Sequence, residues 1–442
     1  MNFFKTGEDK PPLNESSAAI AKIFNQRRWS VFISITLGYA FYYVTRLNFS
    51  VVKKPLLDSG VIDAQQLGLM GSVFFITYAV GKFVNSFLCD RLNVKKFMSI
   101  GLFLSGLCTT FMGLSSTFSL LLILYGLNGW FQSFGAGPSI IALNQWFSDK
   151  ERGTYYGIWF MSHNIGAAVT YMVTAVLVTR YSWQAGFLAP GIIVMVMSVL
   201  LYIFLHDRPE TYGLPNIAEF KGETVVKEVQ DKSVSELQMM VIKSPAVWIL
   251  GLASACCYIT RYAIESWGIV YLTEAKGYSM IGASGLLSTM QMAGVIGTIL
   301  GGFISDKIFN SRRNVPALIF GIVYAGSTAA FLWAPASDMI DVVSMICYGF
   351  SMGILVCFLG GLMAVDIVPR RATGAAMGMI GLFSYMGAAL QENVTGYFIN
   401  AHKTIVGGKA VYDFTAAGEF WVGAAVLSCL LALLVWNVKP KN

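Results

Sequence analysis

Two arginines lie in long apolar stretches of the sequence. Arg46 belongs to Tyr43-x-x-Arg46 and Arg261 to Tyr258-x-x-Arg261. A charged side chain inside a membrane span costs at least ~2.5–3.5 kcal/mol, so such a residue indicates a binding or transport site. Guanidinium groups bind phosphate oxygens in a bidentate geometry and stay protonated in a dry site. We predict that both arginines face one cavity and bind a phosphoryl group, with the two tyrosines on the same helical faces.

Lys82 and His163 are further candidate ligands in apolar stretches. Lys82 follows Tyr78 by one helical turn. Each candidate has a structural alternative: Lys82 could pair with Asp90 or extend toward the membrane surface, and His163 could be a hydrogen-bonded packing residue. Arg46 could likewise be an interfacial anchor, and a carboxylate ligand would satisfy one arginine alone.

The acidic residues of these stretches are few. Glu265 follows Arg261 by one turn, so an i,i+4 ion pair is expected; it would neutralise Arg261 in the empty site or only hold its rotamer. Glu392 has no evident partner. The sequence contains no GxxxxGK[ST] loop, no HExxH motif and no nucleophile elbow, and its seven cysteines lack metal-ligand spacing. We therefore expect no enzyme chemistry, no cofactor and no metal.

The composition of the chain is that of a membrane protein. Only 12% of the 442 residues are charged, against about 25% in soluble domains, and the mean hydropathy is +0.61. About 20 apolar residues cross a bilayer as a helix. We predict twelve such helices, which makes the fold all-α: 29–50, 66–88, 97–114, 119–147, 154–179, 184–205, 246–272, 280–304, 315–334, 340–365, 373–399 and 416–437.

A hydrophilic segment divides the twelve spans into two groups of six. We predict an N-terminal tail (1–28), a six-helix bundle (29–205), a linker (206–245), a second six-helix bundle (246–437) and a C-terminal tail (438–442). Loops on the side of both tails hold 22 Lys and Arg residues, and the opposite loops, which include Lys53 and Lys54, hold 6. This asymmetry predicts that both termini are cytoplasmic; the basic surplus reflects topology and indicates no nucleic-acid partner.

The two halves share three landmarks. Arg46 and Arg261 are offset by 215 residues, and the acids Asp90 and Asp306 by 216. Gly157-x8-Gly166-Ala-Ala recurs as Gly378-x8-Gly387-Ala-Ala, with an offset of 221. Two such halves, each with an acid followed by a basic cluster after its second helix, resemble the major facilitator superfamily, in which substrate binds near the midplane between the halves.

The motifs are most similar to those of the organophosphate:phosphate antiporters of that superfamily. The resemblance covers essentially the whole chain. Its main segments are Gly38-Tyr39, Tyr43-x-x-Arg46, Tyr78-x3-Lys82-Phe83, Asp90-Arg91, Glu151-Arg152-Gly153-Thr154, His163-Asn164, Arg208-Pro209-Glu210, Tyr258-x-x-Arg261-x3-Glu265-x-Trp267 and Gly374 to Tyr385.

The resemblance implies roles for individual side chains. The phosphate ligands would be Arg46, Arg261, Lys82, His163, Tyr43 and Tyr258. Other cavity residues would be Tyr39, Tyr78 and Tyr385, together with the amides Gln132, Asn164 and Gln291, whose neutral groups would bind a sugar. Charge balance or gating would involve Glu265, Asp90, Arg91 and Asp306.

Three positions depart from the family pattern. Gln291 stands where relatives carry a glutamate, which makes the cavity more positive. Met377 and Ile380 stand where hexose-phosphate antiporters carry an acid and a lysine, as in the receptor-like branch of the family.

From these residues we expect a multi-pass protein of a bacterial inner membrane, monomeric in the lipid bilayer. It would exchange a sugar phosphate, glucose 6-phosphate first, for inorganic phosphate by alternating access. One alternative is a membrane sensor on the same fold, and another is a glycerol 3-phosphate:phosphate antiporter. A proton-coupled symporter of neutral sugars would instead need a titratable acid at the midplane.

Overall fold

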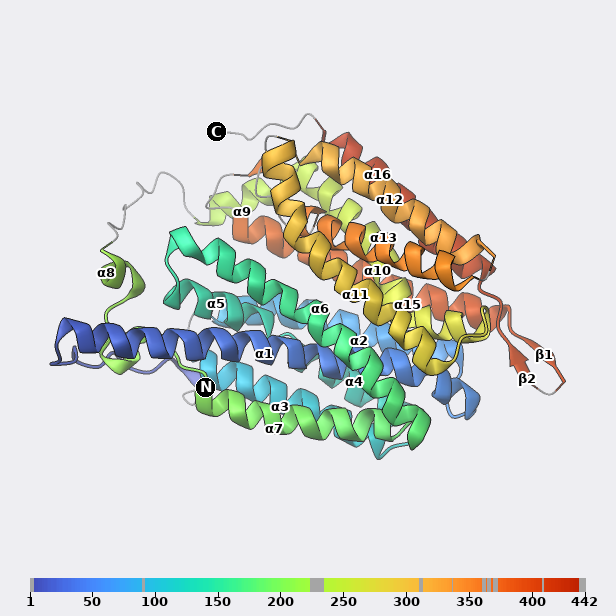
Figure 1. The fold of residues 1–442 in the computed structure, drawn as a ribbon, viewed down its shortest axis with the longest axis horizontal. Coiled ribbons are helices and arrows are strands. Elements are labelled where there is room, and N and C mark those ends of the chain that lie inside the picture. The colour runs from blue at the N-terminus through green and yellow to red at the C-terminus, as the bar shows by residue number, and fades with distance from the viewer. Residues whose placement is uncertain are drawn as a thin grey trace.

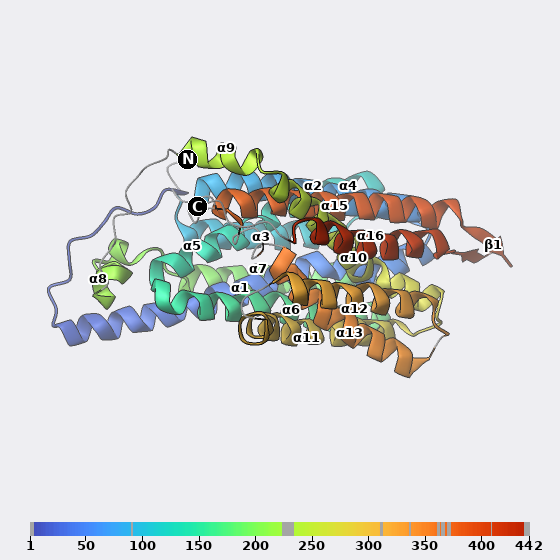
Figure 2. The same cartoon turned by 90° about the horizontal axis from the view of Figure 1, so that it is seen from above.

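The protein consists of two helical bundles that lie side by side (Figures 1 and 2). The computed structural model describes residues 4–89, 92–222, 234–309, 313–335, 337–359, 363, 367–368, 373–407 and 409–436. Nine of the described helices are long and apolar enough to cross a membrane.

The N-terminal half runs from the first helix to residue 205 and carries the blue to green part of Figure 1. Its helices are α1 (Ser17–Asp58), α2 (Ala64–Cys89), α3 (Val94–Gly113), α4 (Phe118–Gln132), α5 (Ala136–Trp146), α6 (Asp149–Arg180) and α7 (Ala185–Phe204). The linker that follows contains η2 (Pro209–Tyr212), α8 (Ile217–Lys221) and α9 (Val234–Ile242).

The C-terminal half carries the yellow to red part of the chain. It contains α10 (Pro245–Glu274), α11 (Met280–Phe303), the π-helical turn η3 (Ile304–Ile308), α12 (Asn314–Trp333), α13 (Asp338–Cys357), α15 (Thr373–Ala401) and α16 (Thr415–Leu434). A short antiparallel hairpin, β1 (Thr404–Val406) and β2 (Lys409–Val411), joins α15 to α16. It projects from one end of the bundle, which we call the hairpin end; the opposite end, where α8 lies, is the linker end (Figure 1).

The predicted first span is part of a much longer helix. Ser16 caps α1 by accepting a hydrogen bond from the backbone of Ala19, and the helix then continues for 42 residues. Lys53 and Lys54 were assigned to a loop on the sequence, which is wrong, because a buried apolar face that includes Val52 and Leu56 extends the helix past residue 50.

The predicted fourth span is divided into α4 and α5. Pro138 lies in the first turn of α5, where its missing N–H is tolerated, whereas in a continuous helix it would clash with the preceding turn. Gly135 lies at the break because a Cβ there would come within 2.9 Å of the Tyr42 ring. The remaining predicted spans each correspond to one of the helices above.

The halves meet most extensively along two helix pairs. Helix α2 lies along α15, and α6 lies along α11, as both views show (Figures 1 and 2). Small residues allow close approach in the first pair: a Cβ at Gly68 would lie 2.5 Å from the Glu392 carbonyl oxygen, and one at Gly396 would lie 2.6 Å from the Ala64 carbonyl oxygen. Such backbone contact is typical of helix packing in membranes.

Candidate functional site

The two arginines predicted to bind an anion are both buried at the centre of the molecule. Arg46 projects from α1 and Arg261 from α10, and each is 3% exposed. The Arg46 guanidinium lies over the rings of Tyr43 and Tyr78, 4.7 and 4.4 Å from their centroids. Its Nε and Nη1 are buried and have no hydrogen-bond partner among the described residues. Arg46 is therefore a desolvated cation with donors free to bind an anion.

Arg261 has a carboxylate partner. Its Nε lies 3.0 Å from Glu265 Oε1, so the expected i,i+4 ion pair is confirmed. The same oxygen accepts a hydrogen bond from Gln291 Nε2 at 3.1 Å, while Glu265 Oε2 is buried and has no partner among the residues described. An amide at position 291 donates to this carboxylate, which a glutamate there would repel at neutral pH.

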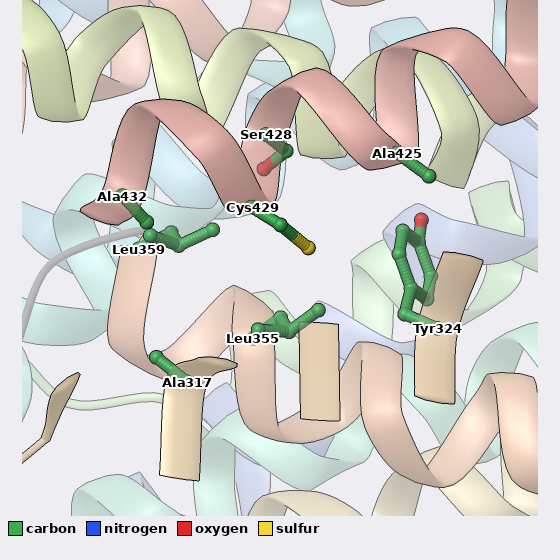
Figure 3. Close-up of a pocket in the computed structure, with 8 residues that line it drawn as sticks. All are labelled: Ala317, Tyr324, Leu355, Leu359, Ala425, Ser428, Cys429 and Ala432. Carbon is green, nitrogen blue, oxygen red and sulfur yellow. The ribbon is translucent and has the colours of Figure 1, made fainter. Parts of the chain in front are cut away.

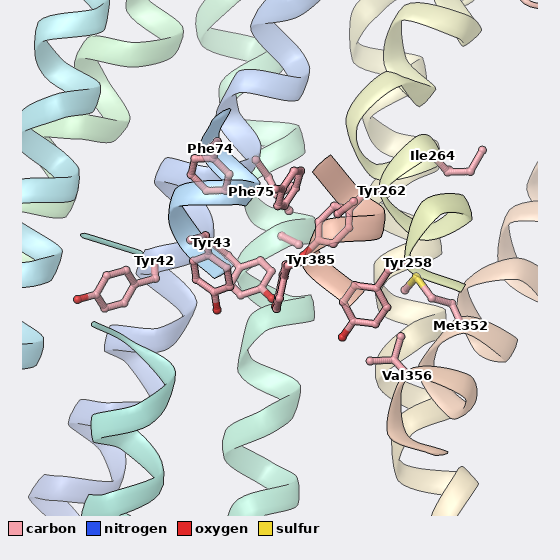
Figure 4. Close-up of a cluster of buried hydrophobic side chains, with 14 of the residues drawn as sticks. Tyr42, Tyr43, Phe74, Phe75, Tyr258, Tyr262, Ile264, Met352, Val356 and Tyr385 are labelled. Atoms are coloured by element: carbon pink, nitrogen blue, oxygen red, sulfur yellow. The ribbon is translucent and has the colours of Figure 1, made fainter. Parts of the chain in front are cut away.

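Aromatic rings connect the two arginines across the boundary between the halves. In Figure 4 Tyr43, Phe75, Tyr258, Tyr262 and Tyr385 lie together between helices of both halves. The Tyr385 ring of α15 lies 5.6 Å from that of Tyr258, whose ring the Arg261 guanidinium approaches at 5.4 Å.

The ring contacts continue into the N-terminal half. Tyr385 also lies 4.6 Å from Tyr78 of α2, the tyrosine beneath Arg46. Phe75 of α2 lies 4.4 Å from Tyr262 of α10. Both cations therefore belong to one buried cluster to which α1, α2, α10 and α15 contribute.

Lys82 extends from α2 toward the other half. Its Nζ lies 5.2 Å from the Tyr385 ring centroid, and a Cβ at Gly381 of α15 would lie 3.5 Å from it. This places a third cation beside the cluster. Asp90, the alternative partner expected for Lys82, lies outside the described residues.

His163 of α6 lies between the two arginine environments. Its Nδ1 contacts the Phe160 carbonyl oxygen, and its ring lies 5.1 Å from that of Tyr43. His163, Asn164 and Arg261 line a common pocket with side chains of α11 and α13. Tyr39 stands beside this group, 6.4 Å from the His163 ring.

Comparison with known proteins gives the family. The sequence model of the Major Facilitator Superfamily matches residues 32–391. The chain belongs to the major facilitator superfamily.

Its relatives place this superfamily member in the organophosphate:phosphate antiporter family. The chain is 31% identical to a probable hexose phosphate transport protein of Chlamydia trachomatis, over 96% of this chain and 94% of that protein. It is 32% identical to a glycerol-3-phosphate transporter of Bacillus subtilis, over 100% and 99% of the two chains. It is also 31% identical to a membrane sensor protein of Salmonella typhimurium, over 88% and 89%.

Solved structures confirm the major facilitator fold. A bacterial homologue of the human lysosomal transporter Spinster, in an inward-facing and unoccupied conformation, matches with a TM-score of 0.76 at 17% identity, over 94% of this chain and 99% of that chain. The nucleoside transporter NupG matches with a TM-score of 0.67 at 14% identity, over 92% and 100%. By its family and its homologues, the chain is a multi-pass transporter-fold protein of the bacterial inner membrane, and not an enzyme.

Two of the three amides predicted to bind the sugar, Asn164 and Gln291, lie beside the arginine cluster. Asn164 lines the pocket described above, and Asn164 Oδ1 and Gln291 Oε1 are buried without hydrogen-bond partners in the part of the chain that the structure describes. Gln132 packs inside the N-terminal half, and its place in the cavity stays a prediction. Its Nε2 donates to the Tyr42 carbonyl at 2.8 Å and to Thr45 Oγ1 at 2.7 Å, because the end of α4 packs against α1 inside the N-terminal half.

The structure describes only some of the predicted gating residues. Asp90 and Arg91, and the side chain of Asp306, lie outside the described residues. On α15, Ile380 is buried and Met377 is 37% exposed. Because both side chains are apolar, neither brings a charge to the cluster.

The structure adds two polar groups that the sequence did not single out. Within the described ranges, the Trp159 Nε1 and the Tyr262 hydroxyl are both buried without a hydrogen-bond partner, and Trp159 stacks on Tyr39 at 4.6 Å. Trp159 precedes His163 by one helical turn, so its spacing from His163 could have predicted that it lies near the site. Tyr262 directly follows Arg261 and therefore does not belong to the Tyr-x-x-Arg pattern.

A second pocket lies within the C-terminal half. It is lined by residues of α12, α13 and α16 and by one residue just after α13: Ala317, Tyr324, Leu355, Leu359, Ala425, Ser428, Cys429 and Ala432 (Figure 3). None of these lining residues is charged, so this pocket offers an anion no counter-charge.

Proposed function

We propose that the protein exchanges a sugar phosphate, with glucose 6-phosphate as the preferred substrate, for inorganic phosphate. The observation that carries this proposal is the buried cluster that holds one arginine from each half, with the Nε and Nη1 donors of Arg46 unpaired. A phosphoryl group presents several anionic oxygens to satisfy both guanidinium groups, whereas a single carboxylate suits one arginine better.

Exchange follows from the charge of the site. In the empty site Glu265 neutralises Arg261, whereas the Arg46 guanidinium lies over the rings of Tyr43 and Tyr78 and has no carboxylate partner among the described residues. Occlusion of such an unpaired cation from water at both ends of the bundle is unfavourable, and bound phosphate removes this penalty. The protein with phosphate bound therefore changes between its inward- and outward-facing conformations more readily than the empty protein.

The unpaired acceptors favour a polyhydroxylated substrate. Asn164 Oδ1, Gln291 Oε1 and Glu265 Oε2 are all buried without hydrogen-bond donors among the described residues. Sugar hydroxyls would supply those donors, whereas a glycerol phosphate would leave more of them unpaired.

Phosphate uptake into proteoliposomes tests this proposal. With sugar phosphate trapped inside, we expect labelled phosphate to enter, and glucose 6-phosphate to compete from outside better than glycerol 3-phosphate. Free glucose should compete poorly because it cannot engage the arginines. Equal competition by the two phosphates would refute selection of the sugar, and strong competition by glucose would refute the phosphate site.

A membrane sensor is the second candidate. It is favoured by the similarity to a protein of that name and by the apolar residues Met377 and Ile380. A protein that binds glucose 6-phosphate in detergent but catalyses no exchange in proteoliposomes would be a sensor.

A further inference from the structure

A buried ion pair joins the two halves outside the cluster described above. Lys53 Nζ of α1 lies 2.8 Å from Glu392 Oε2 of α15, and the two side chains are 0% and 1% exposed. These residues are 339 positions apart in the sequence. The site described above uses neither charge.

The pair is completed by α10 of the C-terminal half. Lys53 Nζ donates to Ser266 Oγ at 2.6 Å and lies 4.0 Å from the Trp267 ring centroid. Trp267 Nε1 donates to Glu392 Oε2 at 2.8 Å. Each charge is therefore compensated only while α1, α10 and α15 are in contact, because an unpaired charge in a dry interior is very costly.

The pair lies between the arginine cluster and the hairpin end. Lys53 is seven residues beyond Arg46 on α1, and Glu392 is seven residues beyond Tyr385 on α15. Seven residues are about two turns, or roughly 10 Å, along the same face of a helix. Lys53 therefore lies on the same face of α1 as Arg46, and Glu392 lies on the same face of α15 as Tyr385, in each case closer to the hairpin end.

Close packing surrounds the pair at this end of the bundle. A Cβ at Gly71 of α2 would lie 2.5 Å from Glu392 Cδ. Ser72 Oγ donates to the Ala389 carbonyl at 2.6 Å, from one half to the other. Lys54 of α1 pairs with Glu274 of α10 at 2.6 Å. The hairpin end is therefore closed in this structure.

We propose that Lys53 and Glu392 form an interdomain latch that holds the hairpin end closed and separates when that end opens. The latch rests on the alternating access of the proposed function. With both partners present, closure buries a compensated pair. With one partner removed, closure buries a lone charge that water solvates in the open state, so the balance shifts toward opening.

A distance measurement between spin labels tests the latch in ligand-free protein in lipid nanodiscs. The labels replace Gln65 and His402, exposed residues near the hairpin ends of α2 and α15, in a background without the native cysteines. We expect a short distance in the parent protein. Lys53→Met and Glu392→Gln should each lower the ratio of closed to open molecules by about tenfold or more.

The double variant Lys53→Met/Glu392→Gln separates a pair from two independent residues. It buries no lone charge, so we expect it to return toward the short distance, as a coupled pair requires. A double variant as open as the single variants would overturn the pairing. Single variants with the parent's distance distribution would overturn the latch.

A buried pair within one half provides the matched control. Lys276 and Asp341 both belong to the C-terminal half and are 4% and 0% exposed. Lys276→Met should lower the thermal stability without lengthening the label distance; an equal lengthening would show general destabilisation and overturn the latch. The label distances are measured without a ligand, so they do not depend on sugar phosphate exchange. Failure of that exchange would count against the proposed function and not against the latch.

Discussion

The two arginines occupy matching positions in the two halves, but their surroundings differ. Arg261 is held by Glu265, while Arg46 contacts tyrosine and phenylalanine rings and keeps two donors unpaired. In the empty site, Arg46 should therefore attract an anion more strongly than Arg261.

Arg46→Lys and Arg261→Lys should each reduce phosphate exchange by about 10- to 100-fold, because lysine keeps the charge but loses bidentate hydrogen bonding. Initial rates of labelled phosphate uptake measure the effect. Arg208→Lys is the control, since Arg208 is partly exposed and pairs with Asp9 outside the site. An Arg46 or Arg261 variant with the rate of that control would not have lost a phosphate ligand.

Glu265→Gln distinguishes charge neutralisation from a purely positional role. Glutamine preserves the shape of the side chain but leaves Arg261 unneutralised, so the KM for phosphate should fall by roughly tenfold. Gln291→Glu should act in the opposite direction, because it adds a carboxylate beside Glu265. If the KM is unchanged in both variants, Glu265 only holds the rotamer of Arg261.

At the scale of elements, the contact between α2 and α15 depends on glycine. Gly68→Leu should abolish most exchange, because even its Cβ would lie 2.5 Å from a backbone oxygen of α15 and would separate the helices at the hairpin end. Gly326→Ala is the control, since a Cβ there meets nothing within 4 Å. Normal exchange by Gly68→Leu, with membrane insertion verified, would contradict the packing described.

The sequence predicted most of the elements and the centre of the site. Apolar length located the helices, and an intramembrane charge located Arg46 and Arg261, because both signals are local. The break at Pro138 was also locally readable but was missed in a continuous apolar run. The Lys53–Glu392 pair could not be predicted, because it depends on which helices of the two halves meet.

For the whole molecule, the uncompensated positive charge of the empty site predicts coupled exchange. Efflux of preloaded phosphate should be at least about tenfold slower into ligand-free buffer than into buffer with phosphate or glucose 6-phosphate, because occluding the empty cationic site from water at both ends is unfavourable. Proteoliposomes loaded with labelled phosphate provide the measurement. Equally rapid efflux into both buffers would indicate a uniporter.

The central claim is that one phosphoryl group binds to arginines of both halves. A structure determined with bound glucose 6-phosphate tests it most directly. We expect phosphate oxygens at about 2.7–2.9 Å from guanidinium nitrogens of both Arg46 and Arg261, with the sugar beside Asn164 and Gln291. A phosphoryl group bound away from either arginine, or a sugar phosphate bound outside the cluster, would contradict the account.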